Sequence, residues 1–112
     1  MADSPSRANM RRALRKEPKS STKLKVYRNT VGLGANIGVR ALDLSETGAR
    51  MVLKEALPVG HDFAIEIEGP SGKPFKATAQ IRWIVKAEDG TYITGATFDK
   101  SVGYAHLSSL AR

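Results

Sequence analysis

Apolar and polar residues alternate along most of the chain after residue 22, which predicts β-strands with one buried face. The run "FAIEIEG" is the clearest, with Phe63, Ile65 and Ile67 predicted to face inward. Six such runs lie at residues 23–28, 39–45, 49–55, 63–69, 75–87 and 88–98. Short strands at this even spacing are typical of a small antiparallel barrel or sandwich.

Turn-forming residues separate these runs. Glycines 32, 34 and 38 favour a loop or hairpin before the second run, and Pro58 with Gly60 marks a later turn. Asp89-Gly90 between two alternating runs predicts a β-hairpin. Only the tail "SVGYAHLSSLAR" has helical spacing: Ser101 is the predicted N-cap, and Tyr104, Leu107 and Leu110 share one face.

Charge divides the chain into two parts. The first 30 residues carry nine basic and two acidic side chains, a net charge of +7, whereas the other residues carry nine of each. We therefore predict a flexible basic N-terminal arm at residues 1–22 and one folded domain at residues 23–112. Such an arm indicates an anionic partner, a nucleic acid, a nucleotide or an acidic surface, unless it is only a solvated leader.

Several classes of function are disfavoured. The chain has no cysteine, and its two histidines, His61 and His106, lie far apart without metal-ligand spacing, so no metal site is expected. No run approaches the length of a membrane span, and no signal peptide is recognised, which favours a cytoplasmic protein. The loop "GLGANIG" departs from the dinucleotide fingerprint, and no nucleophile is framed by a base. We expect no catalytic residues, no cofactor and no enzyme activity.

Two clusters have the chemistry to bind a nucleotide. Arg11 and Arg15 form Arg-x-x-x-Arg, a spacing that presents both guanidinium groups to one object, with Arg12 as a further candidate. Arginine donates bidentately to guanine O6 and N7 or to phosphate oxygens.

The second cluster lies in "ALDLSETGARMVL". Asp43 can accept from guanine N–H donors, and Ser45 can bond a phosphate or sugar oxygen. Gly48 would allow a positive φ in the turn and a close approach of the ligand to the backbone. A purely structural turn, in which Asp43 and Ser45 cap backbone groups, is the alternative.

The order of these clusters, followed by β-strands with "IRW" and "GATF", resembles the PilZ domain family over residues 11 to 98. The resemblance implies a six-stranded antiparallel β-barrel with a short C-terminal helix that binds cyclic di-GMP. It also implies that Arg11 and Arg15 grip the ligand from a mobile arm, while Asp43, Ser45 and Gly48 form the barrel side of the site. For Trp83, core packing is the favoured role and stacking on the ligand the alternative; Phe98 is expected in the core.

The resulting hypothesis is a cyclic di-GMP receptor or adaptor whose arginine arm reorders on ligand binding and signals to a partner protein. Two alternatives remain: a small basic β-barrel that binds nucleic acid, and a PilZ-like adaptor that does not bind the ligand. Sparse aromatic residues, 6% of the chain, disfavour single-strand binding, which needs stacking platforms.

Overall fold

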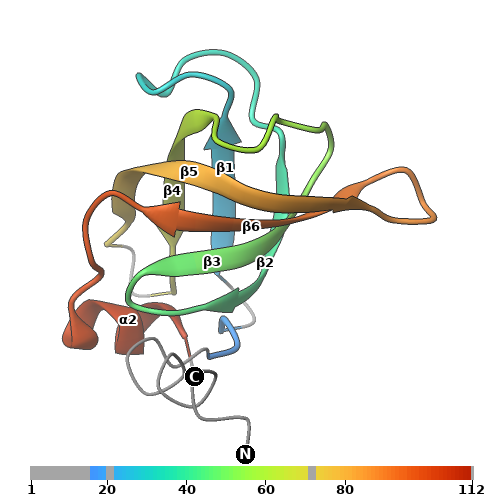
Figure 1. The fold of residues 1–112 in the computed structure, drawn as a ribbon. Coiled ribbons are helices and arrows are strands. Elements are labelled where there is room, and N and C mark those ends of the chain that lie inside the picture. Colours follow the sequence, from blue (N-terminus) through green and yellow to red (C-terminus); the bar gives the residue numbers. More distant parts are fainter. Residues whose placement is uncertain (1–15, 20–21, 71–72, 112) are drawn as a thin grey trace, which may run out of the picture.

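The computed structural model describes residues 16–19, 22–70 and 73–111. Its six strands form one antiparallel sheet that curls into a nearly closed barrel, with a short helix at one end (Figure 1). The sheet order is β1-β4-β5-β6-β3-β2. The predicted fold is confirmed, and the elements are β1 (Lys23–Tyr27), β2 (Gly38–Leu44), β3 (Gly48–Leu53), β4 (Asp62–Glu68), β5 (Phe75–Lys86), β6 (Tyr92–Phe98) and α2 (Tyr104–Leu110).

The barrel interior follows from the alternation in the sequence. On β4, the side chains of Phe63, Ile65 and Ile67 are buried, while the residues between them are only half-buried. Burial of each such side chain stabilises the fold by about 1.5–3 kcal/mol. Phe98 lies at the edge of this core, where its ring centroid is 5.0 Å from that of Phe75.

The hairpin between β5 and β6 forms at the predicted Asp-Gly pair. Gly90 adopts a φ of 89°, which a side chain would disfavour. The Asp89 carboxylate accepts hydrogen bonds from the hydroxyl and backbone N–H of Thr91, at 2.6 and 3.0 Å. These bonds lower the pKa of Asp89. The hairpin projects from the side of the barrel (Figure 1).

The helix α2 closes one end of the barrel, but its start differs from the prediction. Leu107 and Leu110 are buried as expected, whereas the side chain of Tyr104 lies outside the described residues. Ser101 is not the N-cap: the cap is Gly103, without a side-chain hydrogen bond. The reason is Val102, which is buried and whose N–H donates to Glu46 O at 2.8 Å, and this holds the chain outside the helix.

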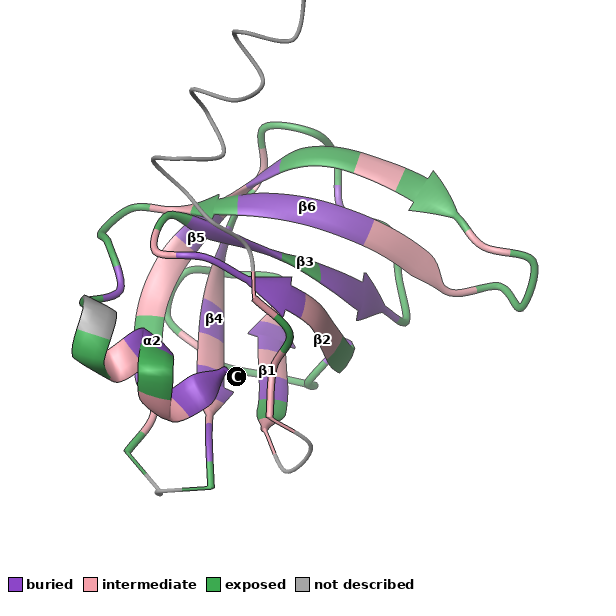
Figure 2. Ribbon diagram, turned by 90° about the horizontal axis from the view of Figure 1, so that it is seen from below, coloured by how far each residue is buried: buried purple, intermediate pink, exposed green. Residues whose placement is uncertain are grey.

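A strap formed by residues 16–19 and 22 crosses the same end of the barrel. Lys16 pairs with Leu44 of β2, and Pro18 pairs with Ala111 after α2. The carbonyl oxygen of Leu110 accepts from Lys19 N at 3.0 Å and from the Thr22 hydroxyl at 2.8 Å. Figure 2 views this end of the barrel, where α2 runs past the strand ends. The strap is thus the described part of the predicted arm, and it is bonded to the body.

One side chain helps to close the seam between the two edge strands of the sheet, β1 and β2. Asn36 Oδ1 accepts from Val26 N of β1 and from Gly38 N of β2, each at 2.8 Å. Ile37 N donates to Val26 O at 2.9 Å beside it. The Asn36 side chain therefore supplies hydrogen bonds that link β1 to β2, where other strand pairs are linked by backbone hydrogen bonds.

We predict that Asn36→Ala lowers the free energy of unfolding by about 1–3 kcal/mol, because two backbone N–H groups lose their acceptor. Asn36→Asp keeps an oxygen acceptor at the same position and should lose clearly less. Urea denaturation followed by circular dichroism measures both values. Equal losses in the two variants would contradict a role for Oδ1.

Candidate functional site

The predicted binding residues fall into two groups. Arg11, Arg12 and Arg15 lie outside the described residues. Asp43, Ser45, Gly48 and Trp83 belong to strands β2, β3 and β5 or to the turn between β2 and β3. The structure therefore describes the barrel half of the predicted site.

Ser45 shapes the turn between β2 and β3. Ser45 is only 4% exposed. Its hydroxyl oxygen accepts from the backbone N–H groups of Gly48 and Thr47, at 3.1 and 3.3 Å. The Ser45 N–H donates to Gly48 O at 2.9 Å. These contacts give Ser45 the structural role that the sequence left open as an alternative, and a contact with a phosphate stays a prediction.

Gly48 is required for a reason other than the one predicted. It has no positive φ and is the first residue of β3. A Cβ atom at this position would lie 2.3 Å from Ala96 O on the neighbouring strand β6. The predicted positive φ is therefore wrong, the absence of a side chain lets the backbone of β6 pass, and a close approach of the ligand at Gly48 stays a prediction.

Asp43 forms an ion pair that the sequence analysis missed. Asp43 and Arg50 face each other across β2 and β3, and Arg50 Nε donates to Asp43 Oδ2 at 2.9 Å. The Arg50 side chain is 46% exposed, against 12% for Asp43. Opposite charges at equal distances on either side of the turn at residues 46–47 are the signal that could have revealed this pair.

Trp83 lies outside the core, which corrects the favoured expectation. It is 38% exposed. Strict alternation from Ile81 would have turned it inward, but a register shift between Ile81 and Trp83 reverses the face of the strand. Its indole ring rests on Gly95, where a Cβ atom would lie 2.2 Å from Trp83 Nε1.

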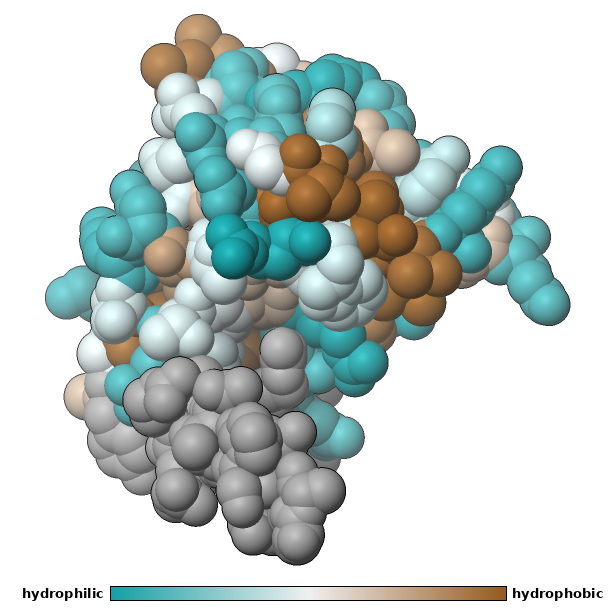
Figure 3. All heavy atoms as spheres, viewed as in Figure 1, coloured by the Kyte–Doolittle hydropathy of each residue, from teal (hydrophilic) through white to brown (hydrophobic). Residues whose placement is uncertain are grey.

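Four of these residues form a row across the outer face of the sheet. Trp83 pairs with Gly95, Gly95 with Arg50, and Arg50 with Asp43. We call this set the Trp83–Asp43 row. Figure 3 shows the face on which strands β5, β6 and β3 lie in front, with hydrophobic side chains gathered over β5 and β6 and hydrophilic groups around them.

The strap meets this row at its acidic end. Lys16 N donates to Leu44 O at 2.6 Å, and Leu44 N donates to Lys16 O at 2.7 Å. Leu44 lies between Asp43 and Ser45 in the chain. The residue that follows Arg15 is thus fixed beside the two predicted polar ligands of the barrel.

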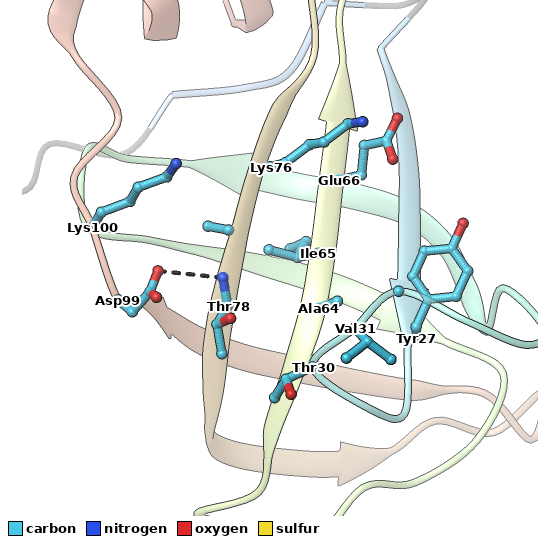
Figure 4. A pocket seen from close by; sticks show the side chains of 12 residues that line it. Tyr27, Thr30, Val31, Ala64, Ile65, Glu66, Lys76, Thr78, Asp99 and Lys100 are labelled. Atoms are coloured by element: carbon cyan, nitrogen blue, oxygen red, sulfur yellow. Dashed lines mark hydrogen bonds between the residues drawn. The ribbon is translucent and has the colours of Figure 1, made fainter.

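A hollow in another part of the surface is lined by none of the predicted binding residues. Its volume is about 460 Å³, and it opens on the outer face of β4 and β5 beside the loop after β1 (Figure 4). Glu66 and Lys76 stand at one end, while Asp99 accepts from Thr78 N at 3.3 Å. We place the candidate site at the row, because the row contains Asp43 and Trp83, whereas the hollow is lined by none of the predicted residues.

The described residues were also considered as a possible metal centre. No group of three His, Cys, Asp or Glu side chains in residues 16–19, 22–70 and 73–111 could hold a metal ion. His61 and His106 each bond a backbone carbonyl, those of Arg28 and Lys73. Over the same residues, no helix is long and apolar enough to cross a bilayer.

Comparison with known proteins gives one positive result. The family model described as PilZ domain matches residues 9–109. The match spans the predicted arginine pair, the strap, all six strands and most of α2. A search of curated proteins found no significant match.

We predict that Gly48→Ala lowers the free energy of unfolding by about 1–3 kcal/mol, because the added methyl group collides with the backbone of β6. Gly103→Ala is the matched control, since a Cβ atom there meets nothing within 4 Å. Denaturant titration should show a loss below about 1 kcal/mol for this control. A Gly48→Ala variant as stable as the wild type would contradict the steric explanation.

Proposed function

Because the chain belongs to the PilZ domain family, a family of cyclic di-GMP receptors and adaptors that are binding domains and not enzymes, we propose that it binds cyclic di-GMP and relays that binding to a partner protein. Arg11 and Arg15, with Arg12, supply the arm half of the site. Asp43, Ser45, Gly48 and Trp83 belong to the barrel half. As a receptor for a bacterial second messenger, it would act in the cytoplasm.

One observation carries this proposal beyond family membership. The two hydrogen bonds between Lys16 and Leu44 fix the start of the strap between Asp43 and Ser45. Lys16 directly follows Arg15 in the sequence, and this contact of Lys16 supports the proposal that the arginine pair acts at the barrel half of the site. Arg15 of the Arg-x-x-x-Arg pair and Asp43 of the Asp-x-Ser turn are 28 residues apart in sequence, and the strap between them is the described segment that supports their joint action on one ligand.

The barrel residues divide the work in this proposal. Ser45 and Gly48 hold the turn and the strand in shape, through the contacts with Thr47 and Ala96 described above. Asp43 contributes its acceptor to the guanine. Trp83, half-exposed on the outer face, offers a ring on which a base can stack, which now favours the second of its two roles.

Electrostatic attraction and ordering together describe the binding step. The net charge of +7 in the first 30 residues attracts a ligand with two phosphates. Ordering the arm costs about 1–2 kcal/mol per fixed residue. Charge-assisted hydrogen bonds of about 1.5–3 kcal/mol each offset that cost. The reordered arm, together with the ligand, would be the surface that a partner recognises.

The same basic arm also supports the second candidate, a barrel that binds nucleic acid. That candidate predicts a steep dependence on salt, because neutralised phosphates release counterions. It also predicts little preference for cyclic di-GMP over an oligonucleotide. A family member that does not bind the ligand would respond to neither.

Calorimetry with cyclic di-GMP, GTP and a short oligonucleotide tests the proposal. We expect micromolar or tighter binding of cyclic di-GMP alone, and at least about tenfold weaker binding by Arg15→Ala and by Asp43→Ala, because each removes a charge-assisted hydrogen bond. Arg7→Ala removes the same charge from the arm while it keeps the arginine pair, so it should bind almost normally.

Three results would speak against the proposal. Salt-dependent oligonucleotide binding without a dinucleotide response would move the assignment to the nucleic-acid candidate. Absence of any response would identify an adaptor that does not bind the ligand. Normal affinity in both Arg15→Ala and Asp43→Ala would retain the function but refute the site.

A further inference from the structure

We propose that Arg50 is a ligand-contacting residue that selects guanine, and that Asp43 acts in large part by positioning it. This inference rests on the proposed function and concerns the barrel half of the same site. It assigns a further arginine to the site, one that comes from the sheet and not from the arm.

The two side chains of this ion pair differ in how far they are exposed to solvent. The Asp43 side chain is 12% exposed, whereas that of Arg50 is 46% exposed. A ligand that approaches the outer face of the sheet therefore meets mainly the guanidinium group of this pair. The bond from Arg50 Nε to Asp43 Oδ2, at 2.9 Å, fixes the plane in which that group lies.

Arg50 has hydrogen-bond donors besides the one that contacts Asp43. A guanidinium group has five N–H donors and no acceptor. Within the described part of the chain, Arg50 uses only its Nε–H in a hydrogen bond. Its two terminal NH₂ groups donate to no other described residue, and the half-exposed side chain leaves them accessible to a ligand.

The chemistry of the base decides what such a group selects. Guanine presents two acceptors, O6 and N7, on one edge, while adenine presents N7 beside the N6 amino donor. A group that only donates matches both guanine atoms but faces a donor on adenine. The neighbouring carboxylate of Asp43 complements the N–H donors at the other side of guanine O6. The pair thus offers donors and an acceptor in the order that guanine requires.

The row places an aromatic ring beside this pair. Trp83 and Arg50 flank Gly95 on neighbouring strands, which puts their backbones about 10 Å apart at a strand spacing near 4.8 Å. The indole extends over Gly95, because that residue has no side chain to block it. A base held by Arg50 can therefore lie against the indole.

The test uses the full chain with cyclic di-GMP and cyclic di-AMP as probes in calorimetry and competition. Arg50→Ala should weaken cyclic di-GMP binding about tenfold or more and reduce the preference over cyclic di-AMP. Arg50→Lys keeps the positive charge but lacks the planar fork, so its preference for guanine should fall as well. Arg28→Ala is the matched control: Arg28 is also ion-paired, to Glu55, and its side chain is 50% exposed, but it lies outside the row.

The positioning role of Asp43 needs a separate measurement. Adding Asp43→Ala to Arg50→Ala should cause a smaller loss than Asp43→Ala causes in the wild type, because the contribution that Asp43 makes through Arg50 is then already lost. Asp43→Asn retains an oxygen that can accept from Arg50 Nε, and it should recover part of the affinity lost in Asp43→Ala. Circular dichroism shows whether each variant is folded.

Three results would contradict these proposals, each in a different way. If the wild type does not bind cyclic di-GMP, the proposed function fails and this inference fails with it. If the wild type binds and Arg50→Ala and Arg50→Lys both keep its affinity and its preference for guanine, only this inference fails. If the losses from Asp43→Ala and Arg50→Ala multiply in the double variant, the positioning role is wrong and the two residues act independently.

Discussion

The close approach of β3 and β6 is the constraint on which the centre of this barrel depends. At Gly48 the carbonyl group of Ala96 occupies the space of a side chain, and at Gly95 the ring of Trp83 does so. Both glycines lie on the outer face of adjacent central strands. Because Gly48 has no side chain, β6 can pass close to β3. Because Gly95 has none, the indole ring of Trp83 can lie over it, and Arg50 remains accessible beside that ring.

The sequence predicted the barrel because alternation along strands such as β4 reports burial directly. It failed where a single backbone event overrides that pattern. The register shift before Trp83 turned an expected core residue outward, and the bond from Val102 N to Glu46 O displaced the start of α2 from Ser101. Such events depend on contacts between segments far apart in sequence, so local periodicity does not contain them.

The candidate site was predictable in composition but only partly in geometry. Asp43, Ser45 and Gly48 were found by their spacing, yet Ser45 and Gly48 contact the protein's own backbone. Arg50 was missed because a lone arginine on a strand has no meaning until its cross-strand partner is known. Arg11, Arg12 and Arg15 stay sequence predictions, since the described residues begin at Lys16.

Trp83 has a practical consequence, because it is the only tryptophan in the chain. All tryptophan emission of this protein therefore arises from one ring, half-exposed on the outer face and seated on Gly95. The native protein thus carries one intrinsic tryptophan fluorophore within the Trp83–Asp43 row, with no second tryptophan elsewhere in the chain. Tryptophan fluorescence can therefore follow, without a label, any event that covers this part of the sheet, removes water from it or changes its polarity.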